Sequence, residues 1–518
     1  MNSGSGSSLR SAGDDGLDLP FMNSYRPAPA FLEHEGSGHP YGPFRSGGER
    51  LSAPIPAGVG LRPLLIAGAV AVSLLGSSLV GIENGFGLLW LLVNTGLQLS
   101  IAAWLLVRPG GATAGALSAG VLTAFVLVVY GSWAPALAAG EPFSPLMPGP
   151  VEKSALEYTT AAALAVTGGL ILVSSIYAMV RGSGSRVNHH EAVPPSRWWR
   201  GTLLMEAIGL CCFVAFKVSS HQPVVSFDLF RPLPASIAQG AAPGRYQFFN
   251  AGIDVSIGAA IAASSLVGLK AYRLRVLTLI VLNLLLYATI GFKYRIVVTL
   301  IGVFAVCTAT RPNQDRRTPR SKRMSMVLAG VAMTTIAFFV VAVYRGNHES
   351  SHFAVTGSSF DIGHLERIAT NSIDIATPYA AIHQQQPGLL LGESYLQLPM
   401  LFLPKAIAGG KALPAMVSLI QTATLPGTGA AVPLWAEADV NFGLIGLLGF
   451  GAILGWVVSR ADTADRRRME SVTMTAATGA VLASVLSRSI MFFALYEFAA
   501  IVFPIWAISR WRPGTRAK

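Results

Sequence analysis

The sequence predicts an all-α polytopic membrane protein with about twelve transmembrane helices and a large extracytoplasmic loop between the ninth and the tenth. Three observations support this prediction. Charged residues make up 12% of the 518 residues and hydrophobic residues 52%, whereas about a quarter of a soluble domain is charged. Apolar runs long enough to span a bilayer recur along the chain. Residues 345–441 interrupt these runs with a polar and apolar segment too long to be a simple connection.

Residues 1–60 are rich in Gly, Ser and Pro, carry mixed charge and have no apolar periodicity. Such a composition cannot bury enough apolar surface to offset the entropy of ordering. We expect a disordered cytoplasmic tail. The first apolar run begins only near residue 63, so we do not expect a signal peptide.

Nine spans are expected within residues 61–344 and three within residues 442–510, followed by a short cytoplasmic tail at 511–518. A membrane helix needs about 20 mostly apolar residues. On that basis the predicted spans are 63–80, 87–107, 112–134, 156–180, 201–217, 251–269, 276–292, 296–310, 325–344, 442–459, 472–487 and 489–509.

Lys and Arg residues gather in alternate loops, mainly at 181–200, 311–323 and 460–468. Cytoplasmic loops carry an excess of these residues, so the distribution predicts that both termini are cytoplasmic and that residues 345–441 lie outside. The net charge of +12 is therefore a sign of membrane topology, and we expect no nucleic-acid partner. The three cysteines lie in apolar runs without metal-ligand or disulfide spacing, so no metal site is expected.

Four basic residues lie at predicted outer helix ends, against the topological bias: Lys293, Arg295, Arg345 and Arg488. A charged side chain in or at the edge of a membrane helix usually indicates a functional site. The alternative is that these side chains extend to lipid headgroups.

Two patterns stand out within the outer loop. Residues 361–380 have helical periodicity, with His364 and Arg367 on a polar stripe that either faces water or lines a cleft. We expect Pro378 to bend or end this helix. Residues 392–405 form an apolar run with two prolines and Lys405, which is typical of an interfacial or re-entrant segment.

Three polar residues, Glu437, Asp439 and Asn441, lead directly into the tenth span. In a helix, residues four apart share a face, so Glu437 and Asn441 should lie together and Asp439 should lie off that face.

The chain resembles the Wzy-type oligosaccharide repeat-unit polymerases, the O-antigen and exopolysaccharide polymerases. Three pieces carry the resemblance: Gly291-Phe-Lys293-Tyr-Arg295, Leu403-Pro404-Lys405 followed by Lys411, and Glu437-Ala-Asp439-Val-Asn441-Phe-Gly443-Leu-Ile-Gly446. In the second piece, Leu413-Pro414 comes two residues later than in the family pattern. The resemblance covers the C-terminal half of the chain.

The resemblance implies a glycosyltransferase of polysaccharide biosynthesis at the outer face of the plasma (inner) membrane. It would join undecaprenyl-pyrophosphate-linked oligosaccharides and release the lipid pyrophosphate. The implied partners are this lipid-linked substrate, membrane lipids, a flippase and a chain-length regulator. Neither a cofactor nor a metal is implied.

Such a reaction needs a base for the attacking hydroxyl and positive charge for the leaving pyrophosphate. The candidates for the base are Glu437, Asp439, His348 and His364. The candidates for binding pyrophosphate or glycan are Arg295, Lys293, Arg345, Arg488, Arg367, Lys405 and Asn441, because guanidinium groups match phosphate oxygens in a bidentate fork.

Two alternatives remain open from the sequence. One is an O-antigen ligase, which uses similar chemistry with another acceptor. The other is a twelve-helix secondary transporter, for which the intramembrane residues Glu206 and Glu497 would be central.

Overall fold

Long helices dominate the structure, a computed structural model that describes residues 151–181, 194–220, 223–224, 244–290, 293–309, 376–385, 388–399, 415–424, 432–462 and 468–510. All of these residues belong to one of the two units of the chain, Gly58–Lys518. The predicted tail, the spans at 63–80, 87–107, 112–134 and 325–344, and most of the outer loop lie outside the described residues.

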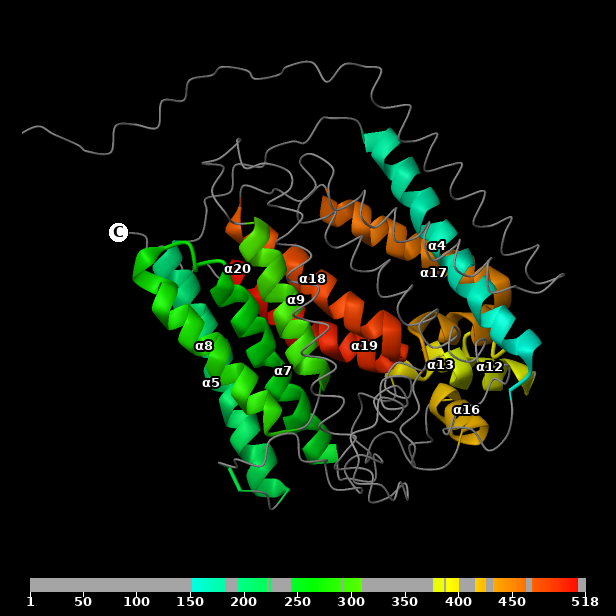
Figure 1. The fold of residues 1–518 in the computed structure, drawn as a ribbon, viewed down its shortest axis with the longest axis horizontal. Coiled ribbons are helices and arrows are strands. Elements are labelled where there is room, and N and C mark those ends of the chain that lie inside the picture. Colours follow the sequence, from blue (N-terminus) through cyan, green and yellow to red (C-terminus); the bar gives the residue numbers. More distant parts are fainter. Residues whose placement is uncertain are drawn as a thin grey trace, which may run out of the picture. The chain divides into compact units, whose positions relative to one another are not determined.

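Every regular element in the described part of the chain is a helix (Figure 1). The long elements are α4 (Lys153–Arg181), α5 (Pro195–Ser219), α7 (Gly244–Ser264), α8 (Lys270–Ala288), α9 (Lys293–Ala309), α17 (Leu434–Asp462), α18 (Met469–Arg488) and the segment formed by α19 (Met491–Glu497), the π-helix η2 (Phe498–Val502) and α20 (Phe503–Arg510). The shorter ones are α12 (Ala376–Gln384), α13 (Glu393–Leu396) and α16 (Ala415–Ala423). These long elements coincide with eight of the predicted spans, from 156–180 to 489–509.

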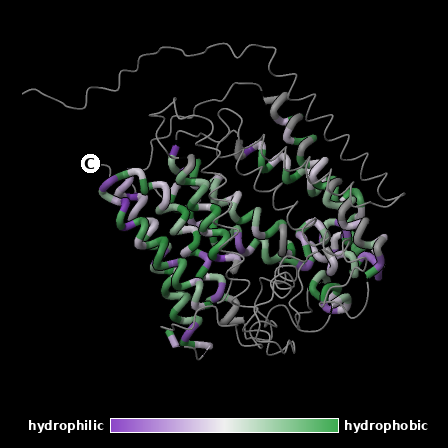
Figure 2. The backbone as a smooth tube through the Cα atoms, in the orientation of Figure 1, coloured by the Kyte–Doolittle hydropathy of each residue, from purple (hydrophilic) through white to green (hydrophobic). Residues whose placement is uncertain are grey.

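Five helices in the described residues are long and apolar enough to cross a membrane: Pro195–Ser219, Lys270–Ala288, Leu434–Arg460, Met469–Leu486 and Met491–Arg510. Apolar residues dominate most of their length (Figure 2). Several point large apolar side chains outward, such as Leu274 (77% exposed) and Ile445 (81% exposed). Exposed apolar surface of this extent indicates contact with lipid. The fold is therefore that of a helical membrane protein, and the total of twelve helices stays a prediction.

Helix α7 lies at the centre of a group of helices and packs against α5, α8, α9, α18 and η2. Its residues Ala259–Ala263 are completely buried. Small residues allow the close approach of α5, because a Cβ atom at Gly209 would lie 2.5 Å from that of Ser256. This close packing brings the polar residues of α5, α7 and α8 together inside apolar helices.

Helix α17 begins eight residues before the predicted span at 442, and the expected end of the outer loop at residue 441 stays a prediction. The helix is interrupted at Gly443, whose φ of 59° and ψ of −145° suit glycine, which has no Cβ. Glu437, Asp439 and Asn441 lie on the short first part, and the apolar span follows the kink.

Helix α12 also differs from expectation. Pro378 lies two residues after its first residue, Ala376, and the helix continues to Gln384. The helix therefore does not end at Pro378. The earlier part of that pattern, 361–375, lies outside the described residues, so the expected bend stays a prediction.

Helices α4 and α17 are in close contact through glycines. A Cβ atom at Gly455 would lie 2.5 Å from the Leu170 carbonyl oxygen, and one at Gly451 would meet the Val166 carbonyl oxygen more closely still. Small residues at such crossings let the backbones of membrane helices approach each other. This crossing holds the start of α4 beside the start of α17.

We expect Gly451→Ala to lower the stability of the protein by about 1–3 kcal/mol, because the new methyl group meets backbone that cannot rotate away. Gly449 is the matched control, since a Cβ atom there has no neighbour within 4 Å. Gly449→Ala should be neutral or stabilising, because alanine has the higher helix propensity. Thermal unfolding of both variants in lipid nanodiscs measures the difference, and equal melting temperatures would contradict the prediction.

Candidate functional site at the start of helix α17

The buried carboxylate of Glu437 joins three elements. Its Oε1 accepts a hydrogen bond of 2.7 Å from the Ser394 hydroxyl on α13. Its Oε2 accepts one of 2.6 Å from the backbone N–H of Met491, the first residue of α19. Glu437 is 2% exposed. The side chain thus connects α17 to α13 and to the start of the last membrane segment.

Asn441 fixes the neighbouring segment, residues 388–399, on α17. Its Nδ2 donates to the Ser394 hydroxyl at 2.8 Å and its Oδ1 accepts from the Gly392 N–H at 3.0 Å. The N–H groups of Leu390 and Leu391 add two backbone bonds to α17. Glu437 and Asn441 therefore meet at Ser394, and their predicted common face is confirmed. Asn441 is completely buried, so its described contacts are structural.

Asp439 points away from that face, as predicted, and lies between two tyrosines. The Tyr158 hydroxyl of α4 donates to Oδ1 at 2.7 Å, and the Tyr379 hydroxyl of α12 donates to Oδ2 at 2.6 Å. Burial and the charge of Asp439 raise the pKa of Tyr379 well above its usual range. Its hydroxyl therefore remains a donor that holds the Asp439 carboxylate in place.

His383 completes this cluster from α12. Its ring stacks on Tyr158, with centroids 3.6 Å apart and an angle of 7° between the planes. Burial lowers the pKa of His383, and the charge of Asp439 only partly opposes this, so the imidazole is neutral near pH 7. His383 and Tyr158 are half-buried, whereas Asp439 and Tyr379 are buried. The former pair is the more accessible side of the cluster.

The lowered pKa of His383 predicts a pH-dependent stability. His383 takes up a proton less readily in the folded protein than in the unfolded chain. Its contribution to the stability of the folded protein is therefore complete above the ordinary pKa of about 6.5 and is lost as pH falls below it. We expect the melting temperature to fall less between about pH 7.5 and pH 5 in His383→Phe, which keeps an aromatic ring but does not titrate. Parallel curves for the wild type and the variant would contradict this.

The structure brings together three of the predicted site residues: Glu437, Asp439 and Asn441. Five others, His348, His364, Arg345, Arg367 and Lys405, lie outside the described residues, as do the side chains of Lys293 and Arg488. Four further residues of this cluster were not predicted from the sequence: Tyr158, Tyr379, Ser394 and His383. A signal existed for Tyr379 and His383, because residues four apart on a helix share a face.

Arg295 belongs to a separate polar cluster between α7 and α9. Its Nε donates to Asp254 Oδ1 at 2.6 Å, and its Nη2 donates to the carbonyl and side-chain oxygens of Asn250 at 2.6 and 2.8 Å. The Tyr294 hydroxyl donates to both carboxylate oxygens of Asp254. Arg295 is completely buried. Its predicted role in binding pyrophosphate stays a prediction, but the described contacts give it a structural role that the sequence did not reveal.

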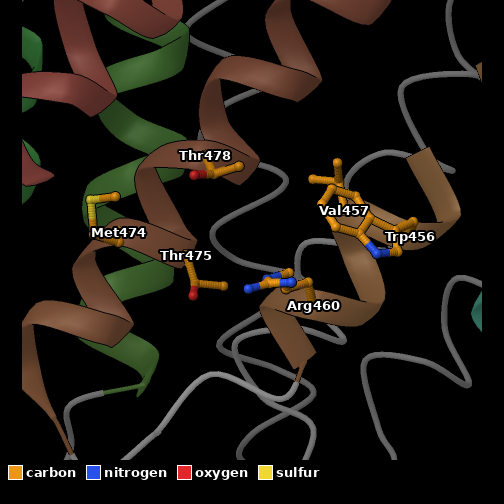
Figure 3. Close-up of a pocket in the computed structure, with 6 residues that line it drawn as sticks. All are labelled: Trp456, Val457, Arg460, Met474, Thr475 and Thr478. Carbon is orange, nitrogen blue, oxygen red and sulfur yellow. The ribbon is translucent and has the colours of Figure 1, made fainter. Parts of the chain in front are cut away.

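A pocket of about 230 Å³ lies between α17 and α18 at the opposite end of α17 (Figure 3). Arg460 extends from α17 toward Thr475 of α18, and its guanidinium lies 5.5 Å from the centre of the Trp456 ring. From the kink at Gly443 to Arg460 the helix rises about 26 Å. This pocket is therefore separate from the cluster around Glu437 and Asp439.

Within the described ranges, no group of three or more His, Cys, Asp or Glu side chains has an arrangement that could hold a metal ion. Comparison of the chain with protein-family models, curated proteins and solved structures gave no match.

Proposed function

We propose that the protein polymerises undecaprenyl-pyrophosphate-linked oligosaccharide repeat units at the outer face of the plasma membrane. The observation that carries this proposal is the buried carboxylate Asp439 between two tyrosine hydroxyls, with a neutral histidine beside it, at the start of a long apolar helix. The sugars of a lipid-linked glycan lie next to the membrane surface. The start of a membrane-spanning helix would lie at the same level. The sequence resemblance to the Wzy-type polymerases supports the same assignment.

Asp439 is the better candidate for the base. A hydroxyl of one repeat unit attacks the anomeric carbon of the donor glycan, the bond from that carbon to the pyrophosphate oxygen breaks, and the hydroxyl proton passes to the base. Each carboxylate oxygen has two lone pairs, so Asp439 can accept a further hydrogen bond while both tyrosines remain bound. The neutral His383, whose ring stacks on Tyr158 at the more accessible side of the cluster, is the candidate to take up that proton next.

Glu437 has the supporting role in this proposal. Both its oxygens bind protein donors that belong to other elements, Ser394 and the Met491 backbone. With Asn441 it fixes residues 388–399 against α17, and so keeps Asp439 aligned with its tyrosines.

The leaving pyrophosphate requires positive charge, which we assign to Arg345 and Arg488, with Arg367 and Lys405 as further contacts to the glycan. Arg488 ends α18, three residues before Met491, whose N–H binds Glu437. Its backbone is therefore close to the carboxylate cluster. Arg295 already forms an ion pair within the protein, which favours the other arginines for this role.

The lipid-linked glycans of cells that lack the protein test the proposal. A polymerase deficiency should leave single repeat units on the lipid carrier, and expression of the full chain should restore the polymer. Full-length chains that remain on the carrier would instead identify a ligase. Unchanged glycans would overturn both assignments.

A secondary transporter is the second candidate, and one observation favours it. The Arg295–Asp254 ion pair and Glu206 lie inside apolar helices, as do the polar sites of many transporters. The same cells discriminate, because loss of a transporter would leave both the lipid-linked repeat units and the polymer at wild-type levels while the uptake of a solute falls.

A further inference from the structure

Glu206 and Asn283 meet deep between α5 and α8. Glu206 is 5% exposed and Asn283 is completely buried. The Asn283 Nδ2 donates a hydrogen bond of 2.9 Å to Glu206 Oε2, and a longer one of 3.4 Å to the carbonyl oxygen of Ser256 on α7. Both helices are among those apolar enough to cross a membrane. A polar pair in this position is separate from the cluster around Asp439.

Two oxygens of this pair have no donor. Glu206 Oε1 and Asn283 Oδ1 are both buried and neither accepts a hydrogen bond. A buried acceptor without a donor is unfavourable, and more so when it is charged. Glu206 Oε1 belongs to the same carboxyl group as Oε2, and Asn283 Oδ1 belongs to the same amide as Nδ2. Oε2 and Nδ2 are the two atoms that already form the 2.9 Å bond. One hydrogen bond between Oε1 and Oδ1 would therefore close a ring and satisfy both.

We propose that Glu206 and Asn283 form a proton-binding site within the membrane helices. The proton resides on Glu206 Oε1 and is donated to Asn283 Oδ1, while Asn283 Nδ2 donates to Glu206 Oε2. The result is a cyclic pair of a carboxylic acid and an amide with both hydrogen bonds formed. Loss of the proton would leave two buried acceptor oxygens without a donor in apolar surroundings, which is unfavourable for both.

The charged groups of the neighbouring helices do not replace this proton. Arg295 of α9 is neutralised by Asp254 of α7, at 2.6 Å. From α8, the Tyr287 hydroxyl is 2.7 Å from the Ser256 hydroxyl. Glu497 of α19 is another buried carboxyl group and brings no positive charge. Helix α20, which also packs against α5, has its basic residue, Arg510, at its last position.

The proton also fits the site better than a metal cation does. Hard cations take about six or more oxygen ligands, whereas the two described oxygens without donors are only one carboxylate and one amide oxygen. The inference goes beyond the proposed polymerisation and does not depend on it.

Infrared spectroscopy of the full chain in lipid nanodiscs tests the proposal. Glu206→Gln should remove a carbonyl band of a protonated carboxylic acid at neutral pH. Its melting temperature should stay close to that of the wild type, because the glutamine amide donates to Asn283 Oδ1 as the acid does. Glu206→Leu should be less stable. Glu497→Gln is the matched control, since it removes another buried glutamate and should leave the Glu206 band in place.

A second variant keeps the proposal testable if Glu206→Gln does not fold. Asn283→Leu should move the acid band to higher frequency, because the carbonyl oxygen of Glu206 loses its donor. Loss of a carboxylate band instead of an acid band in Glu206→Gln would overturn the proposal. So would an acid band that does not move in Asn283→Leu, or one that disappears when sodium is added at constant pH.

Discussion

Asp439→Asn should abolish polymer formation while the protein remains folded. A general base contributes about 10²–10⁴-fold to a reaction rate, and asparagine has no basic oxygen of comparable strength. The amide keeps the volume of the carboxylate. Its oxygen can accept from one tyrosine hydroxyl and its NH₂ can donate to the other, so the contacts with α4 and α12 survive. The measurement is the rate of polymerisation of lipid-linked repeat units by the purified variant.

Glu393→Gln is the matched control, because Glu393 is an exposed carboxylate on the adjacent helix α13 and its described side-chain bond is to Gln397. This variant should polymerise at the wild-type rate. Tyr379→Phe should reduce the rate less than Asp439→Asn does, since it removes one of the two hydroxyls that hold the carboxylate. A wild-type rate in Asp439→Asn would exclude this residue as the base, and Glu437 would then be the remaining described candidate.

Arg295→Ala should have the largest effect on stability, a loss of about 3–5 kcal/mol. The cost arises because Asp254 remains buried without its positive partner and Asn250 loses its donor. Arg295→Lys keeps the charge but cannot reach Asp254 and Asn250 in the same fork geometry, so we expect an intermediate loss. Chemical unfolding in detergent micelles at matched protein concentration measures the three proteins.

A double variant separates the ion pair from a role in substrate binding. Arg295→Ala combined with Asp254→Asn should be more stable than Arg295→Ala alone, because the buried charge has been removed with its partner. A role in pyrophosphate binding predicts a different result, in which Arg295→Lys is as stable as the wild type and still loses polymerisation. Wild-type stability of Arg295→Ala would exclude the structural role.

The sequence predicted the described membrane helices well, because length and hydropathy alone determine which segments suit a bilayer. It could not show which distant residues satisfy the polar side chains at the start of α17. Residues 434–441 have polar side chains that would be costly in lipid, yet Ser394, Tyr158 and Tyr379 satisfy them and the helix extends through the segment. Local periodicity contains no information about those partners.

The same limit applies to the site. The common face of Glu437 and Asn441 was predictable, because it follows from helical geometry within four residues. The two tyrosines were not, since Tyr158 and Tyr379 are 281 and 60 positions away from Asp439. Likewise Arg295 could be identified as unusual from its position, but its partner Asp254 is 41 residues earlier and lies within an ordinary apolar span.

The bond between Glu437 and the Met491 N–H has a consequence for biogenesis. During synthesis, Tyr158, Tyr379 and Ser394 emerge from the ribosome before α17, so Asp439 finds its donors as soon as its helix forms. Glu437 does not, because the donor to its Oε2 lies 54 residues downstream. The start of α17 therefore reaches its final arrangement only after the last membrane segment has been delivered, and a nascent chain that stalls between the two exposes a buried carboxylate to quality control.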